Sequence, residues 1–184
     1  MVNSEDTLES IILAGGCFWC VEAIYKELKG VVSVTSGYSG GRTENPTYEE
    51  VCNGRTGHAE AIEVIFNSQI LSLKEVLEIF FKTHDPTTLN RQGNDEGTQY
   101  RSAIFYNNDN QKRVCEEVKN EIENSHYYPD PIVTEITSLK KFYKAENYHQ
   151  DYYKNHSNQP YCKIVIDPKI RKFRKEFMNR INIK

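Results

Sequence analysis

The stretch Ile11–Tyr25 (IILAGGCFWCVEAIY) constrains the fold most, because it joins an apolar strand to a helix through only two glycines. The run Ile11–Ala14 predicts a buried strand, and residues 22–28 are ordinary helix formers. Gly15 and Gly16 then make the turn between these two elements. The rest of the chain must supply a sheet for this strand and a surface for this helix.

Cys17 lies where this helix is expected to begin. Unpaired N–H groups and the positive end of the helix dipole favour a thiolate there, so we expect the pKa of Cys17 to lie well below about 8.5. Cys17 and Cys20 form a C-x-x-C pattern, which indicates a redox or a zinc site. The second ligand pair of a zinc site is absent from the sequence. Two inert, buried cysteines at the junction are the structural alternative.

Hydrophobic periodicity predicts the order strand, helix, strand, strand, helix, strand, helix. This order favours an α+β two-layer sandwich with a ferredoxin-like βαβ-βαβ core, a mixed sheet and helices on one side. We expect the second strand to pair with the first. The expected strands are Ile11–Ala14, Val31–Tyr38, His58–Phe66 and Tyr100–Tyr106. The first expected helix follows Cys17, the second spans Ser72–Lys82 and starts with a capping box, and the third begins at an N-cap on Asp109. A helical turn is expected at Tyr48–Asn53 and a long loop at Thr87–Thr98.

The strand His58–Phe66 alternates polar and apolar residues in a way that bears on chemistry. Period-two alternation puts Glu60 on the same face as Ile62, Val64 and Phe66. A carboxyl group on the more apolar face is desolvated, which raises its pKa and keeps it protonated. Glu60 is therefore a candidate proton donor, and the alternative is a salt-bridged carboxylate at a strand end.

Beyond Tyr128 the chain changes character, and Pro129 and Pro131 open a short extended piece. An edge strand is expected at Ile132–Ile136, a tyrosine-rich tail at Lys140–Tyr161, and a helix with an apolar stripe and a basic face at Lys169–Lys184. We interpret residues 1–184 as a single catalytic domain, with a core at about 8–136 and a tail and C-terminal helix at 137–184 that wrap the core.

Composition narrows the class of protein. With 38% hydrophobic and 27% charged residues, and with no apolar run of about 20, the chain is expected to be globular and to avoid membranes. The net charge of −3 gives no reason to expect nucleic-acid binding. The acidic N-terminus lacks the features of a signal peptide, which predicts a cytoplasmic location. In that compartment the five cysteines (17, 20, 52, 115 and 162) are not expected to be stapled together, and we interpret Cys52 and Cys115 as structural.

Six blocks in a fixed order extend the glycine–cysteine motif into a family resemblance. The run Gly15–Cys20 (GGCFWC) resembles the active-site motif of the peptide methionine sulfoxide reductase A family. The similarity covers roughly residues 10–165. It continues through Gly37–Gly41 (GYSGG), Asn45–Tyr48 (NPTY), Gly57–Glu60 (GHAE), His84–Pro86 (HDP), Arg91–Arg101 (RQGNDEGTQYR) and Tyr148–Gln150 (YHQ).

The resemblance implies roles for particular residues in an oxidoreductase that reduces the S epimer of methionine sulfoxide, free or in proteins, and so repairs oxidative damage. Cys17 would be the nucleophile and Glu60 the acid that protonates the sulfoxide oxygen. The polar partners of that oxygen would be Tyr48, Asp95 and Tyr100, the methyl group would lie against Phe18 and Trp19, and His149 and His58 would give support.

The implied mechanism leaves Cys17 as a sulfenic acid, which a second thiol converts to an intramolecular disulfide. Cys162 matches the family's usual recycling position, and Cys20 is the rival because it lies one helical turn from Cys17. A thioredoxin-like partner would reduce the disulfide, so no bound cofactor or metal is implied. The alternatives are a general thiol–disulfide oxidoreductase that uses Cys17 and Cys20, and a zinc- or redox-responsive binding module.

Overall fold

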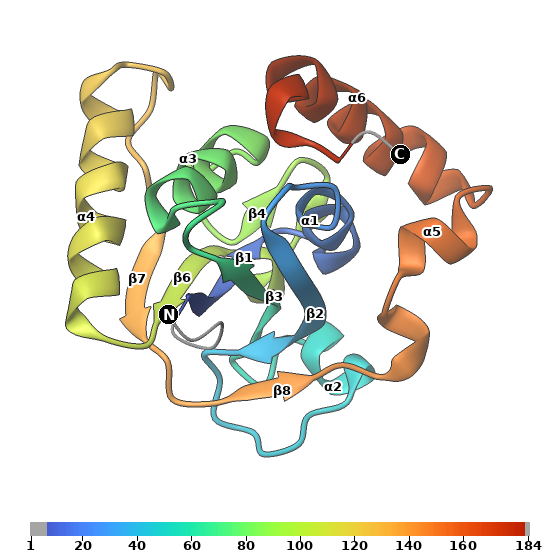
Figure 1. Ribbon diagram of the computed structural model, residues 1–184. Coiled ribbons are helices and arrows are strands. Elements are labelled where there is room, and N and C mark those ends of the chain that lie inside the picture. The colour runs from blue at the N-terminus through green and yellow to red at the C-terminus, as the bar shows by residue number, and fades with distance from the viewer. Residues whose placement is uncertain (1–6, 183–184) are drawn as a thin grey trace.

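A mixed sheet forms the centre of the computed structural model, which describes residues 7–182 (Figure 1). Residues 1–6, which belong to the acidic N-terminus, and residues 183–184, which end the expected C-terminal helix, lie outside the described part. The strand order is β7-β6-β1-β3-β2-β8, and β4-β5 form a separate ribbon. The strands are β1 (Leu8–Gly15), β2 (Val31–Ser39), β3 (Ala59–Asn67), β4 (Arg91–Gln92), β5 (Asp95–Glu96), β6 (Ser102–Tyr106), β7 (Glu135–Ser138) and β8 (Phe142–Lys144).

The four central strands β6-β1-β3-β2 confirm the expected ferredoxin-like core. Every neighbouring pair among them is antiparallel, and the connections β1-α1-β2 and β3-α3-β6 supply the two βαβ halves. The strand β7 runs parallel to β6, which makes the sheet mixed. The expectation that the second strand pairs with the first is wrong, because β3 inserts between β1 and β2.

Helices α1 (Phe18–Tyr25) and α3 (Leu73–Thr83) cover one face of the sheet (Figure 1). The predicted capping box of α3 is present, because the Ser72 and Glu75 side chains bond each other's backbone amides. The helix α4 (Asp109–Asn124) packs beside α3. Its N-cap is Asn108, not the expected Asp109, since the Asn108 side chain accepts from the Gln111 amide. The short helix α2 (Tyr48–Cys52) lies where a helical turn was predicted.

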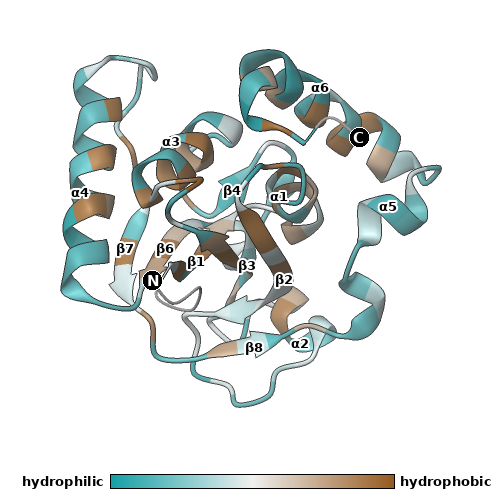
Figure 2. Ribbon diagram, viewed as in Figure 1, coloured by the Kyte–Doolittle hydropathy of each residue, from teal (hydrophilic) through white to brown (hydrophobic). Residues whose placement is uncertain are grey.

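The main core lies between the sheet and these helices, where Figure 2 shows hydrophobic residues on the strands and on the inner helix faces. Ile62, Val64 and Phe66 of β3 are fully buried there, as the alternation predicts. The opposite face of the sheet carries a smaller cluster around Ala61 and Phe105. The strand β8 lies along the outer edge of β2 and helps to cover that second face.

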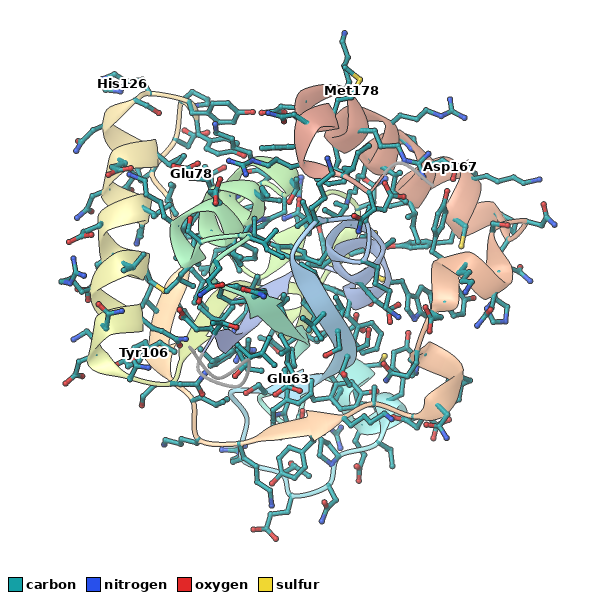
Figure 3. All side chains as sticks on the ribbon, in the orientation of Figure 1. Glu63, Glu78, Tyr106, His126, Asp167 and Met178 are labelled. Carbon is teal, nitrogen blue, oxygen red and sulfur yellow. The ribbon has the colours of Figure 1, made fainter. Side chains whose placement is uncertain are left out.

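The tail after β7 wraps the core as expected, and Figure 1 shows it passing β8 and curling back over α1. It contains α5 (Tyr152–His156), a π-helical turn at Cys162–Ile166 and α6 (Asp167–Glu176). The C-terminal helix therefore ends well before Lys184, and a 3-10 turn at Met178–Arg180 follows it. Met178 points away from the molecule in Figure 3. No helix within residues 7–182 has both the length and the apolar character needed to cross a membrane.

Candidate active site

The start of α1 organises the candidate site, as the sequence predicts. Gly16 has a φ of 90°, and a Cβ atom there would lie 2.6 Å from the Gln92 side chain. Gln92 itself is held by two hydrogen bonds with the backbone of Asp85. Only glycine fits this close approach, because it alone adopts positive φ at little cost and has no Cβ. The turn brings Cys17 to the N-cap position of α1.

Glu60 lies directly beneath this helix start. Its Oε2 atom accepts a 3.0 Å hydrogen bond from the Phe18 amide, and the side chain is buried. Burial raises the pKa of Glu60 to about 8, with smaller contributions from the negative charges of Asp95 and Cys20, and the Phe18 amide opposes the shift. Desolvation therefore wins, and the carboxyl group is mostly protonated at neutral pH.

Tyr48, Tyr100 and Asp95 gather around Glu60 from three different segments. Burial raises the pKa of both tyrosines, and in both cases the Glu60 carboxylate is the second cause. Tyr48 begins α2, Tyr100 ends a 3-10 turn before β6, and Asp95 begins β5. The structure thus brings together all three residues that were expected to surround the sulfoxide oxygen.

The expectation of a lowered pKa for Cys17 is wrong in the free protein. Cys17 is only 6% exposed, and its burial raises the thiol pKa well above the ordinary value. A hydrogen bond to Cys20 and the nearby charge of Glu60 act in the same direction, while the Tyr161 hydroxyl acts against them. The Phe18 amide at the N-terminus of α1 donates its hydrogen bond to Glu60 and is not free for the Cys17 sulfur. Desolvation of Cys17 therefore outweighs the effect of the helix dipole.

An aromatic wall stands over Cys17. Trp19 stacks on Tyr152 with ring centroids 3.7 Å apart, and its Nε1 donates a 3.1 Å hydrogen bond to His149 Nδ1. Phe18 packs against the rings of Tyr48 and His149. His149 Nδ1 is an acceptor here, so the neutral ring carries its proton on Nε2. The wall combines residues of α1 with residues of the tail.

Comparison with known proteins identifies the family of this chain. The model of the peptide methionine sulfoxide reductase family matches residues 9–181. The chain belongs to this family. It is 53% identical over 176 residues to the peptide methionine sulfoxide reductase MsrA of Saccharolobus solfataricus, which covers 96% of this chain and 98% of the relative.

Solved structures agree with the family assignment. Mxr1 from Saccharomyces cerevisiae in reduced form is similar at a TM-score of 0.80 and 36% identity, covering 85% of this chain and 90% of that one. Mxr1 in complex with Trx2 is similar at a TM-score of 0.58 and 29% identity, covering 80% of this chain and 86% of Mxr1.

Two residues expected to support the site of this reductase have different surroundings. His149 contacts Phe18 and Trp19 directly. His58 instead ties two loops together, because its Nδ1 accepts from the Gly41 amide and its Nε2 lies 2.7 Å from the Thr43 carbonyl oxygen. His58 therefore shapes the loop before α2 and has no contact with the aromatic wall among the interactions described.

The remaining cysteines of the reductase are all free thiols. Cys115 is fully buried in α4, which agrees with a structural role. Cys52 is exposed and hydrogen bonds with the Tyr48 side chain, so it does not fill the core. Cys162 is buried in the π-helical turn, where Cys20 is among the groups that raise its pKa. Within residues 7–182 no three His, Cys, Asp or Glu side chains are grouped to hold a metal ion.

Tyr161 is the main site residue that sequence reasoning missed. Its hydroxyl donates a 2.7 Å hydrogen bond to Asp95 Oδ2 and also bonds with Cys17. It stands beside Cys162 in a stretch with several tyrosines and no periodicity, so nothing local distinguished it from its neighbours. Tyr152, which stacks on Trp19, escaped notice for the same reason.

Proposed function

We propose that this protein reduces methionine-S-sulfoxide, free or within proteins, with Cys17 as the nucleophile and Glu60 as the proton donor. The observation that carries the proposal is the buried Glu60 carboxyl group, hydrogen bonded to the amide of the residue that follows Cys17. A sulfinyl sulfur accepts a thiolate readily only when its oxygen is protonated, and a neutral acid beside the thiol meets that need.

The first half-reaction uses the two groups in opposite protonation states. The Cys17 thiolate attacks the sulfinyl sulfur while Glu60 gives its proton to the oxygen. The oxygen then passes to Cys17, methionine leaves with an intact thioether, and Cys17 becomes a sulfenic acid. A pKa of about 8 suits Glu60 to this task, because at neutral pH the group holds a proton and can still release it.

Tyr48, Tyr100 and Asp95 are proposed to surround the sulfoxide oxygen. The raised pKa values of both tyrosines keep their hydroxyl groups protonated, so each can donate a hydrogen bond as negative charge develops on that oxygen. Asp95 holds the Tyr161 hydroxyl, which in turn reaches Cys17. These groups thus orient both the oxygen and the attacking sulfur.

Phe18 and Trp19 are proposed to hold the methyl group of the substrate. Trp19 is anchored on both sides, by the Tyr152 ring and by His149 Nδ1. An apolar wall with so little freedom selects a small methyl group and orients the sulfur toward Cys17. The choice of the S epimer follows because the methyl group and the oxygen are assigned to different residues of the site.

The second half-reaction returns Cys17 to the thiol. A second thiol, from Cys162 or Cys20, condenses with the sulfenic acid, water leaves, and a disulfide remains. Thioredoxin is the proposed reductant, supported by the structure of the related Mxr1 in complex with Trx2. This route draws on thiols alone, without a bound cofactor or metal.

We extend the proposal to the domain organisation and the location of the protein. We treat residues 1–184 as one catalytic domain, because the site draws Cys17 and Glu60 from the core and Tyr161 from the tail. Five free thiols suit a reducing compartment, so the cytoplasm remains the proposed location. Nucleic-acid and membrane partners are not part of the proposal.

A resolved methionine sulfoxide peptide tests the proposed function. With thioredoxin as reductant, the wild-type protein should convert the S epimer to methionine, and Cys17→Ser should abolish turnover. Cys115→Ser, a substitution of a buried cysteine in α4, serves as the matched control and should keep activity. Reduction of the R epimer, or activity in Cys17→Ser, would contradict the proposal. A general thiol–disulfide oxidoreductase would reduce insulin disulfides without needing Glu60.

A further inference from the structure

Cys20 lies near both of the other thiols of the site. The Cys17 and Cys20 side chains share a hydrogen bond, and the Cys20 amide donates a 3.1 Å hydrogen bond to the Cys17 carbonyl. Cys20 is also close enough to Cys162 for its negative charge to raise the pKa of that thiol. The N-cap and N3 positions of a helix, which Cys17 and Cys20 occupy, are one helical turn apart.

The ammonium group of Lys169, from a distant part of the chain, lies next to Cys20. Lys169 lies in α6, which begins at the Asp167 labelled in Figure 3, and its Nζ is 3.9 Å from Cys20 Sγ. The helices α6 and α1 pack against each other, so this position is held by the fold. Lys169 is half-buried and Cys20 is buried, which reduces screening of the charge by water.

The chemistry of the three thiols differs accordingly. The hydrogen bond from Cys17 and the charge of Lys169 lower the pKa of Cys20 against the effect of burial. Burial and the nearby negative charges of Cys20 and Asp167 raise the pKa of Cys162. A thiolate, not a thiol, attacks oxidised sulfur. Among these thiols Cys20 is therefore the best prepared to attack Cys17.

We propose that Cys20 is the thiol that resolves the Cys17 sulfenic acid, that Lys169 is the positioning residue that holds its thiolate, and that Cys162 acts only afterwards. This inference rests on the proposed function, because it starts from the oxidised Cys17. It differs from the expectation that Cys162 attacks Cys17 directly.

The two steps balance in atoms and electrons. The Cys20 thiolate attacks the sulfur of the Cys17 sulfenic acid, hydroxide leaves and takes up a proton as water, and a Cys17–Cys20 disulfide forms. The Cys162 thiolate then attacks Cys20 Sγ, the Cys17 thiolate leaves, and a Cys20–Cys162 disulfide forms. The disulfide thus moves from Cys17 to the tail, where Lys163 and Ile164 beside Cys162 are exposed. A protein dithiol such as thioredoxin supplies the final electrons.

A single turnover without reductant tests the order of the thiols. The protein is mixed with a methionine-S-sulfoxide peptide, quenched at intervals, and analysed for sulfenic acid with a 1,3-diketone probe and for disulfides by peptide mapping. The wild type should form Cys17–Cys20 first and Cys20–Cys162 later. Cys162→Ser should stop at Cys17–Cys20, whereas Cys20→Ser should accumulate sulfenic acid. A direct Cys17–Cys162 disulfide, formed at the wild-type rate in Cys20→Ser, would overturn the proposal.

The role of Lys169 has its own test. Lys169→Met should slow the loss of sulfenic acid at pH 7 by about tenfold, because removing the cation raises the thiol pKa of Cys20 and leaves less thiolate. The pH profile of this step should shift to higher pH, which a merely structural role would not cause. Lys169→Arg should restore much of the rate. Lys172→Met, the same change on the exposed side of α6, is the matched control and should leave both rate and profile unchanged.

The methionine yield separates the two proposals. Each of these variants keeps Cys17 and should release one equivalent of methionine in the first turnover. If the wild type releases none, the proposed function fails. If methionine appears in full but Lys169→Met resolves its sulfenic acid at the wild-type rate and pH, only the role of Lys169 fails.

Discussion

The Phe18 amide and the Glu60 carboxyl group, 42 residues apart in the chain, are joined by a 3.0 Å hydrogen bond. An amide donor favours an ionised carboxylate, yet burial overrides it and raises the pKa of Glu60 to about 8. One contact thus positions an acid beneath Cys17, and burial determines its protonation state. The consequences for stability and for catalysis can be measured separately.

Glu60→Gln should make the protein more stable and less active. The pKa of Glu60 is raised from 4.5 to about 8 on folding, so its favourable contribution is complete below pH 4.5 and is lost as pH rises toward 8. At pH 7 this loss is about 3 kcal/mol, which Gln avoids while still accepting from the Phe18 amide. Urea unfolding at pH 5 and pH 7 measures the difference. Glu63→Gln, on the other face of β3, is the control, and an equal effect of both substitutions would contradict the assignment.

The rate of methionine formation should follow a bell-shaped pH profile. The reactive form has Cys17 ionised and Glu60 protonated. It carries one proton on this pair of groups, as does the form with a Cys17 thiol and a Glu60 carboxylate, so the two forms are populated over the same pH range. The profile should therefore rise with pH up to about 8, where Glu60 titrates, and fall only at the higher pKa of Cys17. Single-turnover rates from pH 5 to 10 provide the measurement. A decline that begins at neutral pH would contradict these protonation states.

Gly16→Ala should be more destabilising than an equivalent change nearby. Gly93 also has a positive φ, but nothing lies within 4 Å of a Cβ built on it. Gly93→Ala should therefore cost only the backbone strain, about 1–2 kcal/mol. Gly16→Ala adds the collision with Gln92 and should cost about 2–5 kcal/mol in total. Thermal unfolding compares the two variants, and equal losses would exclude a steric role for Gln92.

His149→Phe should weaken substrate binding more than it slows the chemical step. The substitution leaves the Trp19 indole N–H without its acceptor. One hydrogen bond of this kind corresponds to an increase of about threefold to tenfold in KM. Trp19 is the only tryptophan of the chain, so its fluorescence reports directly on the change. The exposed His126 provides the control variant His126→Gln, and an unchanged KM in His149→Phe would refute the positioning role.

Tyr161→Phe should make Cys17 less reactive toward an alkylating agent. The Tyr161 hydroxyl is the group that lowers the pKa of Cys17, and its removal leaves the effects of burial unopposed. A hydrogen bond to a charged group corresponds to about a tenfold loss of alkylation rate at pH 8. Peptide mapping after iodoacetamide treatment measures Cys17 alone. Tyr153→Phe removes a hydroxyl that bonds Asp167 instead, and it should leave the Cys17 rate unchanged.

Local sequence patterns predicted most of the core and the positions of the central site residues. The alternation in β3 identified the face of Glu60, and the capping box identified the start of α3. Both signals arise within a few residues of the chain. The pairing of β2 was predicted wrongly because strand order depends on contacts between distant segments, which no local pattern encodes.

The errors at the site share a physical cause. The helix-dipole argument for Cys17 considered only the adjacent helix, whereas its pKa is determined by burial under distant groups. Tyr161 and Lys169 reach the site from the tail, so their importance depends on how the tail packs and not on their sequence neighbours. The residues proposed to carry the chemistry were predicted from the sequence, and those proposed to tune it were not.

The separation of the site residues along the chain has a consequence for folding. Cys17 and Cys20 are neighbours on one turn of helix, and a short nascent segment already brings them together. Glu60 and Asp95 join them only after long-range closure of the sheet, and Tyr161 joins after the tail docks. A partly folded chain should therefore be able to form disulfides before it can reduce a sulfoxide. Oxidation during synthesis is thus the hazard that this order of assembly creates.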